Sequence, residues 1–117
     1  MLAHGAVLRR NGFTVAELEG LARDFHRAGL EEKEVAMMDY AQKVVRDAST
    51  TTQADFERLR QLGWADQDIL SITLAAAARS FVSRVFDALG APPDAIYREL
   101  DEETHHALIG KRPFSVQ

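Results

Sequence analysis

The side chains of this 117-residue chain that could do chemistry are few. It has four histidines and no cysteine, which excludes disulfides, thiolate metal sites and thiol catalysis for these residues. His4 is the candidate base, because an imidazole can move protons near neutral pH. The alternative is a histidine on a frayed first helical turn, since chain termini are commonly loose. The sequence therefore offers a base at His4 with no sulfur nucleophile for it to activate.

Two adjacent histidines, His105 and His106, suggest a metal site at first sight. On a helix their side chains point about 100° apart, so they cannot chelate one ion from a shared face. Glu102 adds one ligand beside His106, which is too few for a structural metal. We therefore expect no metal and no cofactor.

A polar stripe lies on an otherwise apolar predicted helix, residues 66–90. Arg84 and Asp87 in it could form a local i, i+3 pair that faces solvent. Because the rest of this helix is so apolar, we favour a stripe that lines a cavity or a subunit interface. The stripe comprises Thr73, Ser80, Ser83, Arg84 and Asp87.

The helix over 66–90 is predicted to organise the fold. A helix that is apolar nearly all round is either a buried core helix or a membrane span. Two arginines, and a longest unbroken apolar run of only Leu74–Ala78, argue against a membrane. We therefore predict a buried central helix, whose four alanines at 75–78 let a helix of this or another subunit approach closely.

Start and stop signals predict about six helices in one compact all-α domain covering residues 1–117. Thr14 and Glu17 form a capping-box pattern, and no segment shows the alternation of a strand. In the third helix we expect burial of Val35, Met38, Ala41, Val44 and Val45. The predicted helices cover residues 3–10, 15–28, 31–47, 52–62, 66–90 and 93–108.

Composition narrows the partners. The net charge is −4 with 46% hydrophobic and 27% charged residues, values typical of a soluble globular protein. No basic residues cluster into a phosphate-binding stripe, so nucleic acid is not an expected partner. The first residues lack the basic region and cleavage pattern of a signal peptide, and we expect a cytoplasmic location.

Several segments, in order along the chain, resemble the alkylhydroperoxidase D-like or carboxymuconolactone decarboxylase superfamily, in particular its peroxidase-related branch. His4-Gly5 is similar to the end of the family's C-x-x-C-x-x-x-H-G pattern. The other segments resemble its D-Y-A-x-K, D-x-x-x-L-R, F-N-x-x-N-R-x-x-D-x-L-G and G-R-P patterns. They are Met38–Lys43, Asp55–Trp64, Ser80–Gly90 and Leu108–Pro113.

The resemblance implies thiol-dependent reduction of a small hydroperoxide, with His4 in the proton relay. It also implies a homo-oligomer, a trimer or a multiple of it, whose interface includes the central helix and the region of Met37 and Met38. In the family pattern the second cysteine would fall directly before Met1. Ser80 and Ser83 replace the two asparagines.

We therefore expect an N-terminally truncated domain that is inactive as this cysteine-free chain. Two alternatives stay open: a non-catalytic oligomerising helical module, and a cysteine-independent enzyme akin to the lactone decarboxylases with His4 as base.

Overall fold

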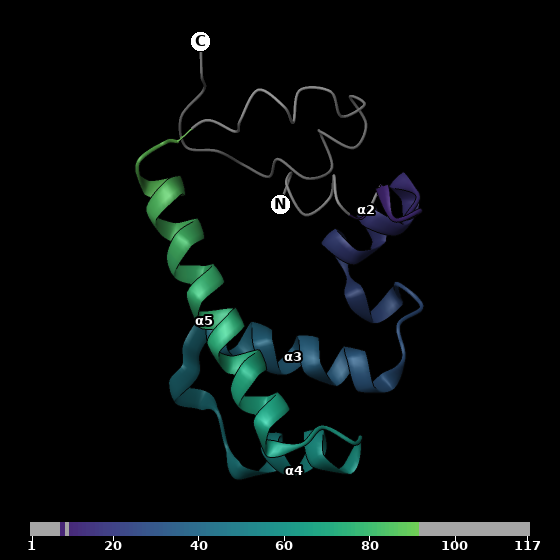
Figure 1. Cartoon of the computed structure of the whole chain (residues 1–117), viewed down its shortest axis with the longest axis vertical. Coiled ribbons are helices and arrows are strands. Elements are labelled where there is room, and N and C mark those ends of the chain that lie inside the picture. The colour runs from purple at the N-terminus through teal and green to yellow at the C-terminus, as the bar shows by residue number, and fades with distance from the viewer. Residues whose placement is uncertain (1–7, 9, 92–117) are drawn as a thin grey trace. The chain divides into compact units, whose positions relative to one another are not determined.

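The computed structural model describes residues 8 and 10–91, and over this part of the chain it is all-helical, as predicted (Figure 1). The predicted helix over 93–108, and nearly all of that over 3–10, lie outside the described residues. The described residues fall into two compact units, one up to Gly29 and from Phe86 onwards, the other Leu30–Val85. The elements are α2 (Val15–Arg23), the 3-10 helix η1 (Phe25–Arg27), α3 (Glu32–Asp47), the 3-10 helix η2 (Ala48–Thr50), α4 (Gln53–Gln61) and α5 (Asp66–Ala88).

Helix α2 begins with the predicted capping box. The Thr14 hydroxyl accepts the Glu17 N–H at 3.2 Å, and the Glu17 carboxylate accepts the Thr14 N–H at 2.8 Å. The hydrogen bonds that the Glu17 carboxylate accepts from the Thr14 N–H and from the Thr14 hydroxyl lower the pKa of Glu17 below its usual 4.5. The helix ends at Arg23, earlier than predicted, because the Asp24 carboxylate accepts the His26 N–H at 3.1 Å and starts the 3-10 helix η1.

Helices α3, α4 and α5 share one hydrophobic core within the unit Leu30–Val85. Its buried residues are Ala36 and Tyr40 on α3, Leu59 on α4 and Ile69 on α5. The five α3 residues that we expected to be buried are only partly so. The inward face of α3 instead follows Ala36, Tyr40 and Val44 at four-residue spacing, because the Tyr40 ring is placed against α4 and α5. Partly buried side chains complete the core: Val44, Phe56, Leu62, Trp64 and Ile72.

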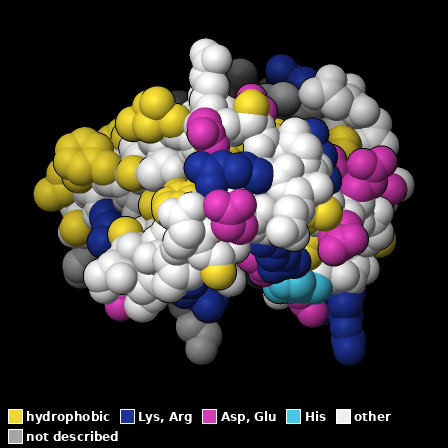
Figure 2. Space-filling view, turned by 90° about the horizontal axis from the view of Figure 1, so that it is seen from below, with side chains coloured by type: hydrophobic (Ala, Val, Ile, Leu, Met, Phe, Trp, Pro, Cys, Tyr) yellow, Lys and Arg dark blue, Asp and Glu magenta, His cyan; other side chains and the backbone are white. Residues whose placement is uncertain are grey.

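Helix α5 has the predicted length but not the predicted burial. Only its Ile69 is buried, whereas Leu70 is 58% exposed, Leu74 61% and Phe81 70%. The prediction of a buried central helix is therefore wrong for the described residues. The core lies against one side of α5 and leaves a second apolar side uncovered. Exposed hydrophobic side chains gather at the left edge of Figure 2.

The C-terminal end of α5 matches the stop signal in the sequence. Gly90 has φ +64°, a left-handed conformation that glycine adopts without steric cost. Its N–H donates to the Asp87 carbonyl at 3.2 Å, and the Ala91 N–H donates to the Phe86 carbonyl at 3.0 Å. Two of the carbonyls that a helix end leaves without intrahelical partners are thereby satisfied.

Candidate functional site

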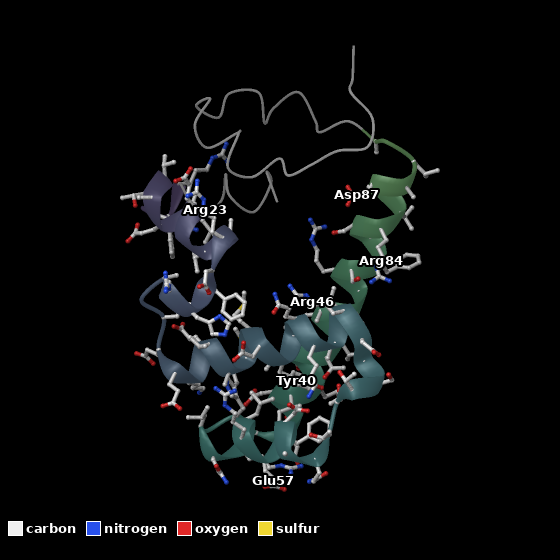
Figure 3. All side chains as sticks on the ribbon, turned by 180° about the vertical axis from the view of Figure 1, so that it is seen from behind. Arg23, Tyr40, Arg46, Glu57, Arg84 and Asp87 are labelled. Atoms are coloured by element: carbon white, nitrogen blue, oxygen red, sulfur yellow. The ribbon has the colours of Figure 1, made fainter. Side chains whose placement is uncertain are left out.

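The predicted polar stripe of α5 makes hydrogen bonds to α3 of the same chain. The Arg84 Nη2 donates to the Val45 carbonyl at 3.0 Å. Val45 lies in the last turn of α3, where carbonyls lack intrahelical donors and a cation is favoured by the helix dipole. Ser80 and Ser83 are half-buried, and Asp87 is exposed. Figure 3 labels Arg84 and Asp87 on α5.

Thr73 joins the same stripe to the buried core. Its hydroxyl donates to the Ile69 carbonyl at 2.7 Å, and its oxygen lies 2.7 Å from the Tyr40 hydroxyl. Because a threonine hydroxyl has one proton, Tyr40 must be the donor to Thr73. This bond satisfies the polar end of a tyrosine that is only 5% exposed. The Tyr40 phenol is therefore used in holding α3 to α5.

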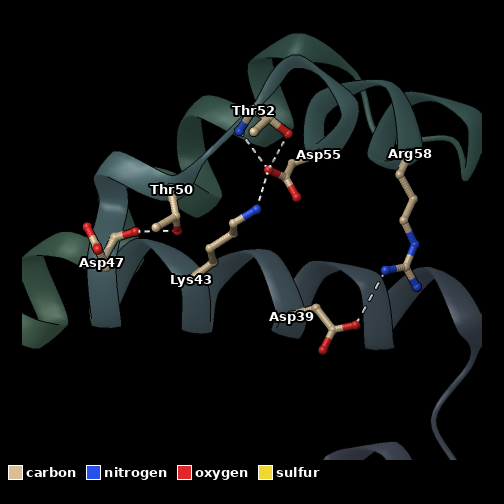
Figure 4. Close-up of polar contacts among 7 residues, drawn as sticks. All are labelled: Asp39, Lys43, Asp47, Thr50, Thr52, Asp55 and Arg58. Atoms are coloured by element: carbon tan, nitrogen blue, oxygen red, sulfur yellow. Dashed lines mark hydrogen bonds and ion pairs between the residues drawn. The ribbon is translucent and has the colours of Figure 1, made fainter.

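Lys43 and Asp55 connect α3 to the start of α4. The Lys43 Nζ lies 2.7 Å from the Asp55 Oδ2, which also accepts the Thr52 N–H at 2.7 Å (Figure 4). The hydrogen bond from Lys43 lowers the pKa of Asp55 below its usual 3.8, and the hydrogen bond from the Thr52 N–H has a smaller effect in the same direction. Asp55 thus closes the capping box of α4 and pairs with Lys43 at once. A carboxyl group whose pKa lies below its usual value is a poor general acid or base near neutral pH.

A second ion pair joins the same two helices. Arg58 Nη1 of α4 lies 3.5 Å from Asp39 Oδ2 of α3, and Figure 4 shows this pair beside Lys43 and Asp55. Both side chains are partly exposed, so the pair contributes little free energy.

Trp64 makes a contact that sequence reasoning did not predict. Its Nε1 donates to the Lys33 carbonyl at 3.0 Å, and the Lys33 Nζ lies 4.3 Å from the ring centroid. The cation over the indole face adds a favourable electrostatic contact. The two residues are 31 positions apart, and no local spacing in the sequence signals such a pair.

The remaining candidates lie outside the described residues: His4, and Glu102, His105 and His106. Among the described residues, no group of three histidine or acidic side chains could hold a metal ion. What the described part offers is a set of interhelical contacts made by the motif residues.

Helix α5 is the one described helix long and apolar enough to cross a membrane. Crossing would place Arg79 and Arg84 in the lipid, at a cost of several kcal/mol, and would break the hydrogen bonds of Thr73 and Arg84 to α3. The contacts therefore favour α5 as a surface helix of a helical unit.

Comparison with known proteins does not identify a family for this chain. No protein-family model, curated protein or solved structure matches this chain. The likeness to the alkylhydroperoxidase-like superfamily therefore rests on the sequence motifs alone.

Proposed function

We propose that this chain is a diverged, peroxidase-related member of the alkylhydroperoxidase-like superfamily that works as a cytoplasmic helical scaffold without thiol catalysis of its own. One observation supports this most. The motif residues from three segments make the contacts that hold α3, α4 and α5 together. Lys43 pairs with Asp55, Tyr40 bonds to Thr73, and Arg84 bonds to the last turn of α3.

These roles explain how a family pattern can persist without the family's chemistry. Attack on a peroxide O–O bond by this route requires a thiolate, which then passes through a sulfenic acid or disulfide. The chain has no cysteine, whereas its motif residues keep their packing roles.

The first test measures activity directly. The purified 117-residue chain is incubated with an alkyl hydroperoxide and a dithiol reductant, and peroxide consumption is followed. We expect peroxide to be consumed no faster than in the same mixture without protein. Turnover above that rate that survives metal chelators would show that another residue does the chemistry.

A second test addresses the family directly. The codons upstream of Met1 are read in frame, and any encoded extension is expressed with and without His4→Ala. A Cys-Xaa-Xaa-Cys ending directly before Met1, with peroxidase activity that depends on His4, supports membership of the superfamily but overturns the scaffold role without thiol catalysis. An in-frame stop codon there supports the non-catalytic scaffold, and activity that is equal in the two proteins removes His4 from the mechanism.

A second candidate function, a non-catalytic oligomerising module, is favoured by the exposed apolar side chains of α5. Contiguous exposed apolar surface commonly marks an interaction site. We extend the proposal to a homo-oligomer, a trimer or a multiple of it, whose interface includes α5 and the region of Met37 and Met38. Both methionines are partly buried on α3.

A further inference from the structure

Four large apolar side chains of α5 form one exposed face. Leu70, Leu74, Phe81 and Val85 are 58%, 61%, 70% and 38% exposed. At 3.6 residues per turn they fall within an arc of about 60°. We call these four residues the α5 apolar face.

A different side of α5 contacts the core. Ile69 and Ile72 pack into the core of α3 and α4. Thr73 and Arg84 hydrogen-bond to α3. Whatever covers the apolar face must therefore approach from the other side of α5.

The spacing of the apolar face is self-complementary. Leu70 and Val85 lie equally far from the pair Ala77–Ala78, and so do Leu74 and Phe81. A two-fold interface requires this property, because the same surface serves both copies. An unrelated partner would require no such symmetry.

We propose that α5 pairs antiparallel with α5 of a second copy of this chain, with the two-fold axis between Ala77 and Ala78. Leu70 then lies opposite the second copy's Val85, and Leu74 opposite its Phe81. The alanines at the centre carry no bulk, so the backbones approach closely there. Antiparallel packing also sets the two helix dipoles in opposite directions.

The size of this face predicts the strength of the pair. From residue 70 to residue 85 the helix rises about 22 Å, and one helix face of this length buries less than the roughly 800 Å² per partner of a standard interface. We expect a dimer that dissociates at micromolar concentration. A two-fold pair occurs in dimers and hexamers but not in a bare trimer. Of the trimer and its multiples proposed above, the pairing is therefore compatible with the hexamer, in which three such pairs join two trimers.

Cysteine cross-linking tests the register, because the chain has no cysteine of its own. A disulfide forms only where the two Cα atoms come within about 7 Å. Ala78→Cys, next to the axis, should cross-link to itself under mild oxidation. Ala75→Cys is the matched control, since Ala75 is also exposed but lies outside the arc of the apolar face. Leu70→Cys mixed with Val85→Cys should give the mixed dimer in preference to either homodimer.

The outcomes separate the possibilities. Cross-linking of Ala78→Cys at least ten times faster than that of Ala75→Cys, together with the mixed dimer, supports the pairing. Equal rates for the two alanine variants, or cross-linking of Leu70→Cys only to itself, overturn it.

A second experiment introduces a charge into the α5 apolar face by substitution. Phe81→Glu should weaken dimerisation at least tenfold while circular dichroism retains the helix content, and Ala75→Glu should leave dimerisation unchanged. A protein that is monomeric at every concentration but sediments with phosphatidylcholine vesicles would assign the face to a lipid surface and overturn the proposal. None of these measurements depends on peroxidase activity or family membership, so the pairing can fail while the proposed scaffold without thiol catalysis stands, and the reverse.

Discussion

At the scale of single residues, the motif side chains act through partners that are distant in sequence. Tyr40 bonds to a residue 33 positions away, and Lys43 to one 12 positions away. Helical periodicity places both side chains on α3, but it does not say which residue of another helix they meet. The sequence therefore indicated these residues through family resemblance, and the structure assigns their roles.

Removing the Tyr40 hydroxyl should destabilise the protein modestly. Tyr40→Phe keeps the ring, which contacts Phe56 with centroids 5.9 Å apart, and loses only the hydrogen bond to Thr73. A loss of about 1 kcal/mol in the free energy of unfolding is expected, the usual net value of one hydrogen bond. Urea denaturation measures it, with Thr73→Ser as the control that retains the acceptor. A variant as stable as the parent chain would show that this bond contributes nothing.

The contribution of Asp55 to the free energy of unfolding should change with pH only in the acid range. Its folded-state pKa is lowered, first by Lys43. Its contribution is therefore complete above the usual value of 3.8 and is lost as the pH falls through the lower folded value. Asp55→Asn should cost about 1 kcal/mol at pH 7, a small figure because both side chains of the pair are partly exposed.

Urea midpoints of the parent chain and Asp55→Asn at several pH values provide the measurement. The difference between the two urea midpoints should stay constant from about pH 8 to pH 5 and should decrease below about pH 4. A difference that increases in acid would contradict a lowered pKa of Asp55 in the folded state.

At the scale of elements, local sequence signals predicted where helices begin and end, but they did not predict how deeply a helix is buried. The capping boxes at Thr14 and Thr52, and the stop at Gly90, are encoded within a few residues. Burial of α5 depends on how many neighbours surround it. The apolar circumference of α5 predicted a surrounded helix, but the described residues cover one side. A surplus of apolar surface in a sequence therefore indicates a contact without saying which chain supplies it.

Arg84 should stabilise the C-terminal end of α3. Arg84→Gln removes the charge near the last turn and should cost about 0.5–1 kcal/mol in the free energy of unfolding. The matched control is Arg79→Gln, a change of the same kind at an exposed position of the same helix. Equal losses in the two variants, read from urea denaturation in low salt, would remove the special role of the bond to Val45.

At the scale of the whole molecule, the all-helical class was predictable, and the functional site only in part. The polar stripe was expected to line a cavity or a subunit interface; two of its members bond to α3, and an apolar face elsewhere on α5 is exposed. Side-chain types place both stripes on the helix wheel, but only the tertiary arrangement decides which one the chain covers. His4 lies outside the described residues, so its role stays a prediction.

The association of whole chains through α5 is the central claim, and sedimentation equilibrium tests it most directly. The unmodified chain has a mass of 13.0 kDa. Between about 1 and 200 μM, a range suited to a weak interface, the mass should rise from that value to twice it or to a higher even multiple. Phe81→Glu should hold the monomer mass over the same range. An unmodified chain that remains at 13.0 kDa throughout would contradict the account.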